Sequence, residues 1–109
     1  MGLDAYINKK VINEKMLIIR NLGNEDITEE ILYWRKDYAI NEYFGNNYGL
    51  ENCVPIILSV EDLKDFINFL KELNTNGEND GEYSEDIQKL KDELKGDTDN
   101  YEYSYYAWW

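Results

Sequence analysis

Carboxylates are the groups in this sequence that are most able to do chemistry. The chain has 23 Asp and Glu against 11 Lys and Arg, and it has no His. Histidine is the commonest general base and metal ligand, so its absence removes the usual centre of an active site. Carboxylate pairs arise by chance on a surface this dense in charge, and none stands out as a general acid and base. The net charge of −12 repels nucleic acid and anionic membranes and favours basic partners.

Residues 76–81, NGENDG, have the first half of a calcium-binding loop. Oxygen-bearing side chains fill loop positions one, three and five, and glycine fills position six. Position twelve should be a bidentate Glu, but here it is Ile87, which a helix core needs. We therefore interpret this segment as a solvated turn and expect no metal site. Residues 97–100 also offer oxygen ligands in a row, and we interpret them as a connection between a helix and a strand.

The single cysteine, Cys53, excludes an internal disulfide and a thiolate zinc cage, so we expect a reducing, cytoplasmic setting. No His, Lys or Arg lies close to it in sequence to activate the thiol, and we interpret Cys53 as a buried structural residue. The chain has no glycine-rich phosphate loop, HExxH or GxSxG motif. We therefore predict that it is not an enzyme and expect neither catalytic residues nor a cofactor.

Residues 33–36, YWRK, are the one cluster that combines aromatic and basic side chains. Such a cluster is able to contact nucleic acid or a phosphate. However, its surroundings are acidic, and two cations do not make a basic stripe. We favour a core position for Trp34, with the two cations paired to Asp37 or Glu42 on the surface.

Two other features indicate a binding surface. Residues 72–109 hold eleven Asp or Glu against three Lys, and six of the sixteen aromatic residues lie among the last nine positions. Carboxylates about 5–7 Å apart approximate the spacing of backbone phosphates, and Tyr and Trp anchor interfaces. The predicted partner-binding residues are therefore Glu78, Asp80, Glu82, Glu85, Asp86, Asp92, Glu93, Tyr106, Trp108 and Trp109.

The apolar pattern of the first half predicts two strands and a helix. Residues 3–8 alternate apolar and polar, which is typical of a strand, and residues 16–19 form a second short apolar run. A helix is predicted over residues 34–44, with residues 45–47 closing it. Its start stays open, because Asp26 and Glu29 have capping-box spacing, whereas the residues just before Trp34 also fit an extended segment.

The second half predicts a short strand, two helices and a terminal strand. Residues 54–58 fit a strand that Pro55 keeps at an edge or first position. The helix over residues 59–74 starts with a capping-box variant and has one apolar face, formed by Val60, Leu63, Phe66, Ile67, Leu70 and Leu73. Ser84 is predicted to cap a second helix that ends at Gly96. Residues 101–109 alternate like an edge strand with aromatics on both faces.

These elements predict an α+β fold, with a small, mainly antiparallel sheet and two or three helices packed on one face. An all-α fold is the alternative if the short apolar runs are helical. At 109 residues we expect one domain spanning 1–109. The N-terminus carries Asp4 where a signal peptide needs basic residues, and no apolar run reaches the length of a membrane span.

Two blocks of the sequence resemble a family. The opening MGLDAYI, followed by YWRK at residues 33–36 and INEYF at residues 40–44, is similar to a widespread group of small uncharacterised phage and prophage proteins. Those proteins typically begin MGLDMYL and carry YWRK-x3-IH-x-WF. This chain departs from the pattern at Asn41, where the family has His, and at Tyr43, where it has Trp. The resemblance implies a mobile-element origin and carries over no functional residues.

For a small, acidic, phage-type protein without His, we predict a stoichiometric inhibitor. Its partner would be a basic host protein, a nuclease or other nucleic-acid-binding defence protein, in the host cytoplasm. This is the anti-CRISPR or anti-restriction type of DNA mimic, with no direct nucleic-acid or membrane binding. One alternative is a structural or regulatory phage protein that forms a homodimer through its C-terminal strand. Another is a small-molecule or nucleotide-binding domain with an aromatic-lined pocket.

Overall fold

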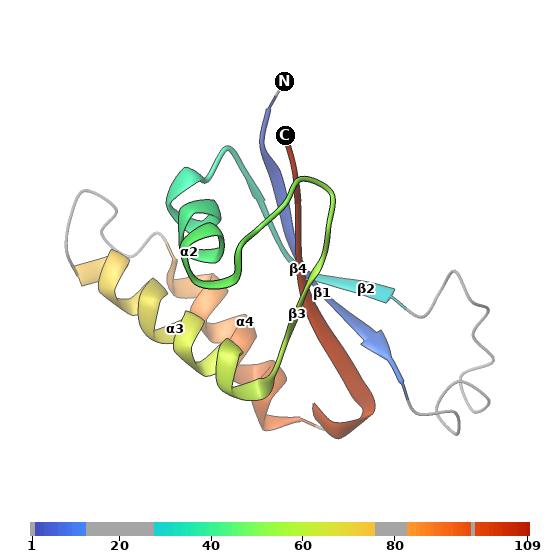
Figure 1. Ribbon diagram of the computed structural model, residues 1–109. Coiled ribbons are helices and arrows are strands. Elements are labelled where there is room, and N and C mark those ends of the chain that lie inside the picture. Colours follow the sequence, from blue (N-terminus) through green and yellow to red (C-terminus); the bar gives the residue numbers. More distant parts are fainter. Residues whose placement is uncertain (1, 13–27, 76–82, 97) are drawn as a thin grey trace.

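The computed structural model describes residues 2–12, 28–75, 83–96 and 98–109 (Figure 1). The predicted strand over residues 16–19, the capping residue Asp26 and the calcium-like segment 76–81 lie outside the described residues. Four strands are described: β1 (Asp4–Val11), β2 (Thr28–Arg35), β3 (Ile56–Leu58) and β4 (Tyr101–Trp108). The helices are α2 (Tyr38–Tyr48), α3 (Val60–Thr75) and α4 (Ser84–Lys95), followed by the short 3-10 helix η2 (Thr98–Asn100).

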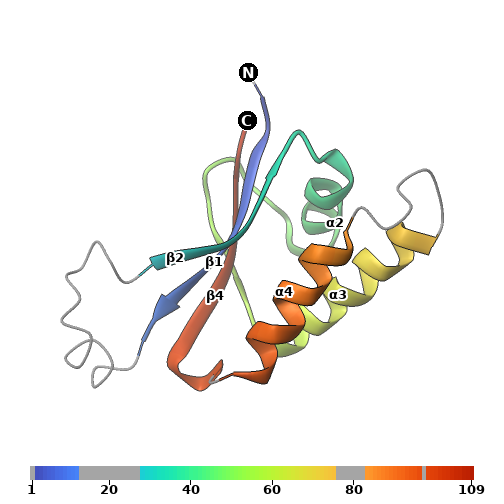
Figure 2. The ribbon, with the colours of Figure 1, turned by 180° about the vertical axis from the view of Figure 1, so that it is seen from behind.

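The strands form one antiparallel sheet in the order β2-β1-β4-β3. Figures 1 and 2, which view the molecule from opposite sides, show α2, α3 and α4 together on one side of this sheet. The predicted α+β fold is therefore confirmed. Among the described residues, no helix has the length and apolar character needed to cross a membrane.

The core lies between the sheet and the three helices. In β1 the buried side chains are Ala5, Ile7 and Val11, because alternate residues of a strand point to the same face. The register places Ile7 opposite Leu32 of β2 and Tyr105 of β4, and all three side chains are buried. The predicted alternation of the first strand therefore defines the inner face of the whole sheet.

The predicted helix over residues 34–44 is wrong at both ends. Trp34 belongs to β2, where it lies opposite Ala5, so the extended alternative is the correct one. The core position predicted for Trp34 is confirmed, since the residue is 7% exposed. Helix α2 begins only after Asp37, whose carboxylate accepts a hydrogen bond from the backbone N–H of Ile40 at 3.2 Å. The helix then runs past residues 45–47 and ends at Gly49, which has a φ of 65°.

Helix α3 confirms its predicted start. The backbone N–H of Asp62 donates to Ser59 Oγ at 3.1 Å, and the backbone N–H of Ser59 donates to Asp62 Oδ2 at 2.9 Å. This reciprocal pair satisfies two N–H groups at the helix end and lowers the pKa of Asp62, chiefly through the Ser59 backbone bond. Ser84, by contrast, is the first residue of α4 and not its cap, because Tyr83 occupies the cap position without a capping side-chain bond.

The C-terminal strand is present but is not an edge strand. Strand β4 pairs with β1 along its whole length and with β3 through residues Tyr103–Tyr105. Its three inward positions, Tyr103, Tyr105 and Ala107, face the helix layer and are fully buried in the core. The short strand β3 takes the edge position instead, as the proline before it predicts.

We predict that Leu70→Ala lowers the free energy of unfolding by about 2–5 kcal/mol, the usual cost of truncating a buried Leu. Leu70 lies on the inner face of α3 and is fully buried. Denaturant unfolding followed by circular dichroism measures the change. Ile57→Ala is the control, because Ile57 is 57% exposed and its loss leaves no buried cavity. Equal stability of the Leu70 variant and the native chain would contradict the described core.

Candidate binding surfaces

The predicted partner-binding acids divide into three groups. Glu78, Asp80 and Glu82 lie outside the described residues. Glu85 and Asp92 are exposed on α4, as a contact or steering role requires. The other two acids of α4, Asp86 and Glu93, point toward the sheet and take part in internal contacts.

Asp86 connects α4 to the sheet. Its Oδ2 accepts a hydrogen bond from Trp34 Nε1 at 2.9 Å, and the side chain is half-buried. Burial raises the pKa of Asp86, and the bond from Trp34 only partly opposes this rise. Asp37 raises it further by charge repulsion, and itself accepts a hydrogen bond from the Tyr83 hydroxyl at 2.8 Å. Asp86 is thus a structural acid of the native fold.

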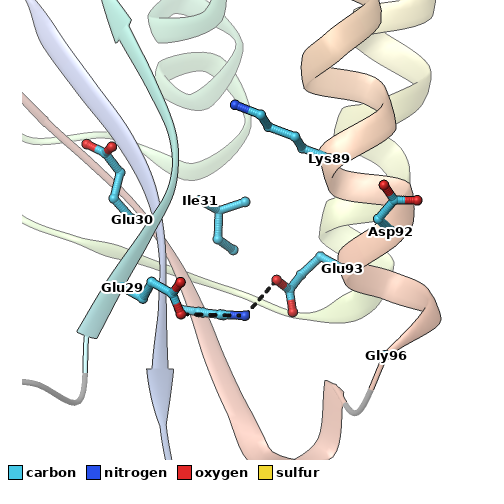
Figure 3. Close-up of a pocket in the computed structure, with 8 residues that line it drawn as sticks. Glu29, Glu30, Ile31, Lys89, Asp92, Glu93 and Gly96 are labelled. Carbon is cyan, nitrogen blue, oxygen red and sulfur yellow. Dashed lines mark hydrogen bonds and ion pairs between the residues drawn. The ribbon is translucent and has the colours of Figure 1, made fainter.

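Glu93 is held in a pocket between β2 and α4, where Figure 3 shows it facing Glu29 across the gap. The Lys9 Nζ atom lies between them, 2.9 Å from Glu93 Oε1 and 3.7 Å from Glu29 Oε2. Glu93 also accepts a hydrogen bond from the Tyr103 hydroxyl at 3.2 Å. Burial disfavours the charge of Lys9, but the bond and charge of Glu93 outweigh it and raise the pKa of Lys9.

The volume of this pocket is about 380 Å³, and its other lining residues are Glu30, Ile31, Lys89, Asp92 and Gly96. The Lys9 ammonium already pairs with Glu29 and Glu93, the two carboxylates that face each other in this pocket. In the part of the chain that the structure describes, no group of three or more His, Cys, Asp or Glu is placed to hold a metal ion.

A row of tyrosines crosses the side of the sheet that faces away from the helices. Tyr6 lies opposite Tyr33 of β2 and Tyr106 of β4, on the face opposite to buried Ala5 and Ile7. The ring centroids of Tyr6 are 5.0 Å from Tyr33 and 6.4 Å from Tyr106. In Figures 1 and 2, the described helices α2, α3 and α4 all lie on the opposite side of the sheet.

Trp108 and Asp4 extend this row toward the end of the sheet. Trp108 lies opposite Asp4 in the register and is 39% exposed. Asp4 accepts a hydrogen bond from the Tyr33 hydroxyl at 2.5 Å, which raises the pKa of Tyr33. We call Tyr6, Tyr33, Tyr106 and Trp108 the aromatic face. Its geometry suits contact with flat or cationic groups, because tyrosine and tryptophan rings offer both area and a polar handle.

Trp109 lies apart from the aromatic face. Its backbone N–H donates to Asn52 Oδ1 at 3.0 Å, and its carbonyl accepts from Asn52 Nδ2 at 3.2 Å. The side chain lines a separate pocket of about 300 Å³ with Leu3, Tyr38 and Asn41, next to α2. The predicted binding residues therefore do not form one surface: the exposed acids belong to α4, Tyr106 and Trp108 to the aromatic face, and Trp109 to this pocket.

Cys53 contradicts the sequence interpretation of a buried thiol. It is exposed, with a φ of 63°, on the segment between α2 and β3. Its backbone N–H donates to the carbonyl oxygen of Ala107 at 2.9 Å, which extends the pairing of β4 beyond β3. The backbone of Cys53 thus joins the sheet, and its Sγ donates a hydrogen bond to Asn52 Oδ1 at 3.5 Å.

Asn41 and Tyr43, the two residues at which the chain departs from the phage-protein pattern, both contact other elements of the fold. Asn41 accepts a hydrogen bond from the Tyr105 hydroxyl at 2.9 Å, and Tyr43 stacks on Phe69 with ring centroids 4.4 Å apart. Both residues are thus used in packing between elements. Comparisons of the chain with family models, curated proteins and solved structures find no match.

We predict that Asp86→Asn removes a pH-dependent loss of stability. A raised pKa in the folded state means that folding binds a proton, so the stabilisation is present below the ordinary aspartate pKa of about 3.9. This stabilisation from the Asp86 carboxyl is lost as the pH rises through the raised pKa of Asp86 in the folded state. Relative to the native chain, the variant should therefore gain free energy of unfolding as pH rises, while its amide oxygen still accepts from Trp34.

Denaturant unfolding at a series of pH values measures this difference. Asp92→Asn is the matched control, because it removes one charge from an exposed position of the same helix. A parallel pH dependence for Asp86→Asn and the native chain would show that the buried carboxyl does not carry the effect.

Proposed function

We propose that the chain is a stoichiometric inhibitor that binds a basic, nucleic-acid-binding protein and blocks access of DNA or RNA to it. A host defence nuclease is the class of partner that a phage origin suggests. The observation that carries the proposal is the aromatic face, in a chain of net charge −12. Four large aromatic side chains lie on the side of the sheet opposite to the described helices α2, α3 and α4.

Nucleic-acid-binding grooves are lined by Arg and Lys, and these are the side chains that the aromatic face is suited to accept. A guanidinium or ammonium group is attracted to the face of a tyrosine or tryptophan ring, more strongly once both are desolvated. Asp4 lies beside Tyr33 and Trp108. However, Arg35 of this chain lies opposite Asp4 and lines the same pocket, so the rings and the net charge of the chain would supply the attraction. The interface would thus combine aromatic anchors with charge complementarity.

The exposed acids of α4 have a different part in this proposal. Glu85 and Asp92 lie in the helix layer, so they do not share a contact surface with Tyr106 and Trp108. Their charges would still act on an approaching basic protein within a Debye length, about 8 Å at physiological salt. They would therefore raise the association rate rather than anchor the complex.

Self-association is the second candidate, and the same uncovered aromatic face favours it. Strand β4 has neighbours on both sides, so a dimer formed by adding a strand to its edge is not available to the described residues Tyr103–Tyr105. A dimer through this strand would instead bring two aromatic faces together. Sedimentation at increasing protein concentration distinguishes this candidate, because a self-associating chain gains mass without any partner.

We predict that Tyr6→Ala and Trp108→Ala each raise the dissociation rate of the partner complex at least tenfold, as loss of an interface anchor does. The partner is first captured from a host extract, and rates are then measured by surface plasmon resonance. Tyr38→Ala is the matched control, since Tyr38 is 65% exposed but lies on α2. Point substitutions are used because truncation after Ser104 would remove the buried Tyr105 and Ala107.

The acids require a separate variant. Glu85→Lys combined with Asp92→Lys should slow association and weaken its salt dependence while leaving dissociation unchanged. The nuclease activity of the captured partner, assayed with and without this protein, tests inhibition directly. A complex that survives both aromatic substitutions, or a partner whose activity the bound protein does not change, would contradict the proposal.

A further inference from the structure

A groove between α3 and α4 has a charge opposite to that of the chain. Its volume is about 290 Å³, and its lining residues are Lys64, Ile67, Asn68, Lys71, Lys91, Leu94 and Lys95. Every charged side chain in this lining is a lysine, although acids outnumber bases by two to one in the chain. We call these residues the lysine groove.

Helical spacing produces the groove. On α3, Lys64 and Lys71 are two turns apart and Ile67 lies between them, so all three follow one stripe of the helix. On α4, Lys91 and Lys95 are one turn apart and flank Leu94. Ile67 is 5% exposed and Leu94 packs partly against the core, so an apolar floor lies between two cationic rims.

Among the described residues, the charges of Lys64, Lys91 and Lys95 are only weakly balanced from within the chain. The ion pair between Lys64 Nζ and Glu61 Oε1 has a distance of 3.3 Å, and both side chains are largely exposed. Exposed pairs of this kind neutralise little of the local potential. Lys91 and Lys95 have the same sign at i and i+4, an arrangement that slightly destabilises a helix. An anionic occupant would relieve this repulsion.

We propose that the lysine groove binds an amphipathic helix of a partner protein, one whose apolar stripe is flanked by Asp and Glu. Such a helix places carboxylates at i, i+4 and i+7, which matches the spacing of the lysines along α3 and α4. Its apolar stripe would cover Ile67 and Leu94, as in the helix-in-groove mode of recognition. The pattern is that of an apolar seam with charged flanks that select the partner.

Two features favour an acidic helix over a nucleic acid. A phosphate backbone binds through its charge and gains nothing from the apolar floor between the lysine rims. The remainder of a chain with net charge −12 would also repel the phosphates of a nucleic acid. An amphipathic helix, by contrast, presents apolar side chains to the floor and carboxylates to the rims. This inference concerns the helix layer and does not depend on the function proposed for the aromatic face.

The test uses a fluorescent synthetic peptide of about four helical turns. It has leucine at heptad positions a and d and glutamate at e and g, a pattern that keeps the free peptide from self-associating. Fluorescence anisotropy should show binding to the native chain that weakens as salt rises. Lys91→Gln combined with Lys95→Gln should weaken binding about three- to tenfold, the loss expected for two exposed charge pairs.

Lys10→Gln combined with Lys36→Gln is the matched control, because both lysines are exposed, lie outside the groove and remove the same total charge. Full binding by this control, together with loss in the groove variant, supports the proposal. The proposal is overturned by any of three results: no binding to the native chain, equal loss in both variants, or tighter binding of a single-stranded oligonucleotide of equal charge. A failure here leaves the partner-binding test of the aromatic face unaffected.

Discussion

Strand β1 pairs with a neighbour on each side, and the other elements take their places from this double pairing. Ile7 lies opposite Leu32 of β2 and Tyr105 of β4, and the three buried side chains form the floor on which the helices pack. The Tyr105 ring then stacks on Phe44 of α2, with ring centroids 3.8 Å apart. One strand therefore sets the register of the sheet and, through it, the position of a helix.

The same alternation that builds the core also builds the aromatic face. A residue between two inward positions of a strand must point outward, so burial of Ala5 and Ile7 places Tyr6 on the open side. The register then brings Tyr33 and Tyr106 beside it. A shift of one residue would bury these tyrosines and expose the core. The geometry of the candidate surface is thus as well defined as that of the core.

Local patterns could be read from the sequence, whereas contacts between distant residues could not. The Ser59–Asp62 cap is predictable because both partners lie within one turn. The spacing of Trp34 from neighbouring apolar residues also fits a helical stripe, and only pairing with β1 selects the strand. The outward row of tyrosines is not predictable from the sequence for the same reason: each tyrosine belongs to a different strand, and one sequence does not reveal the order of the strands.

The charged residues show most clearly that contacts between distant residues cannot be predicted from one sequence. Asp86 and Glu93 belong to an acidic helix, yet their partners Trp34 and Lys9 are 52 and 84 positions away in the chain. From composition alone, these acids are expected on the surface. In the folded protein they point toward the sheet and form internal contacts. Lysines of the same helix, which composition counts only as a minority charge, face α3 and line a groove of their own. The net charge of −12 therefore influences how fast a charged partner associates with the protein. The local arrangement of side chains determines what each face can bind.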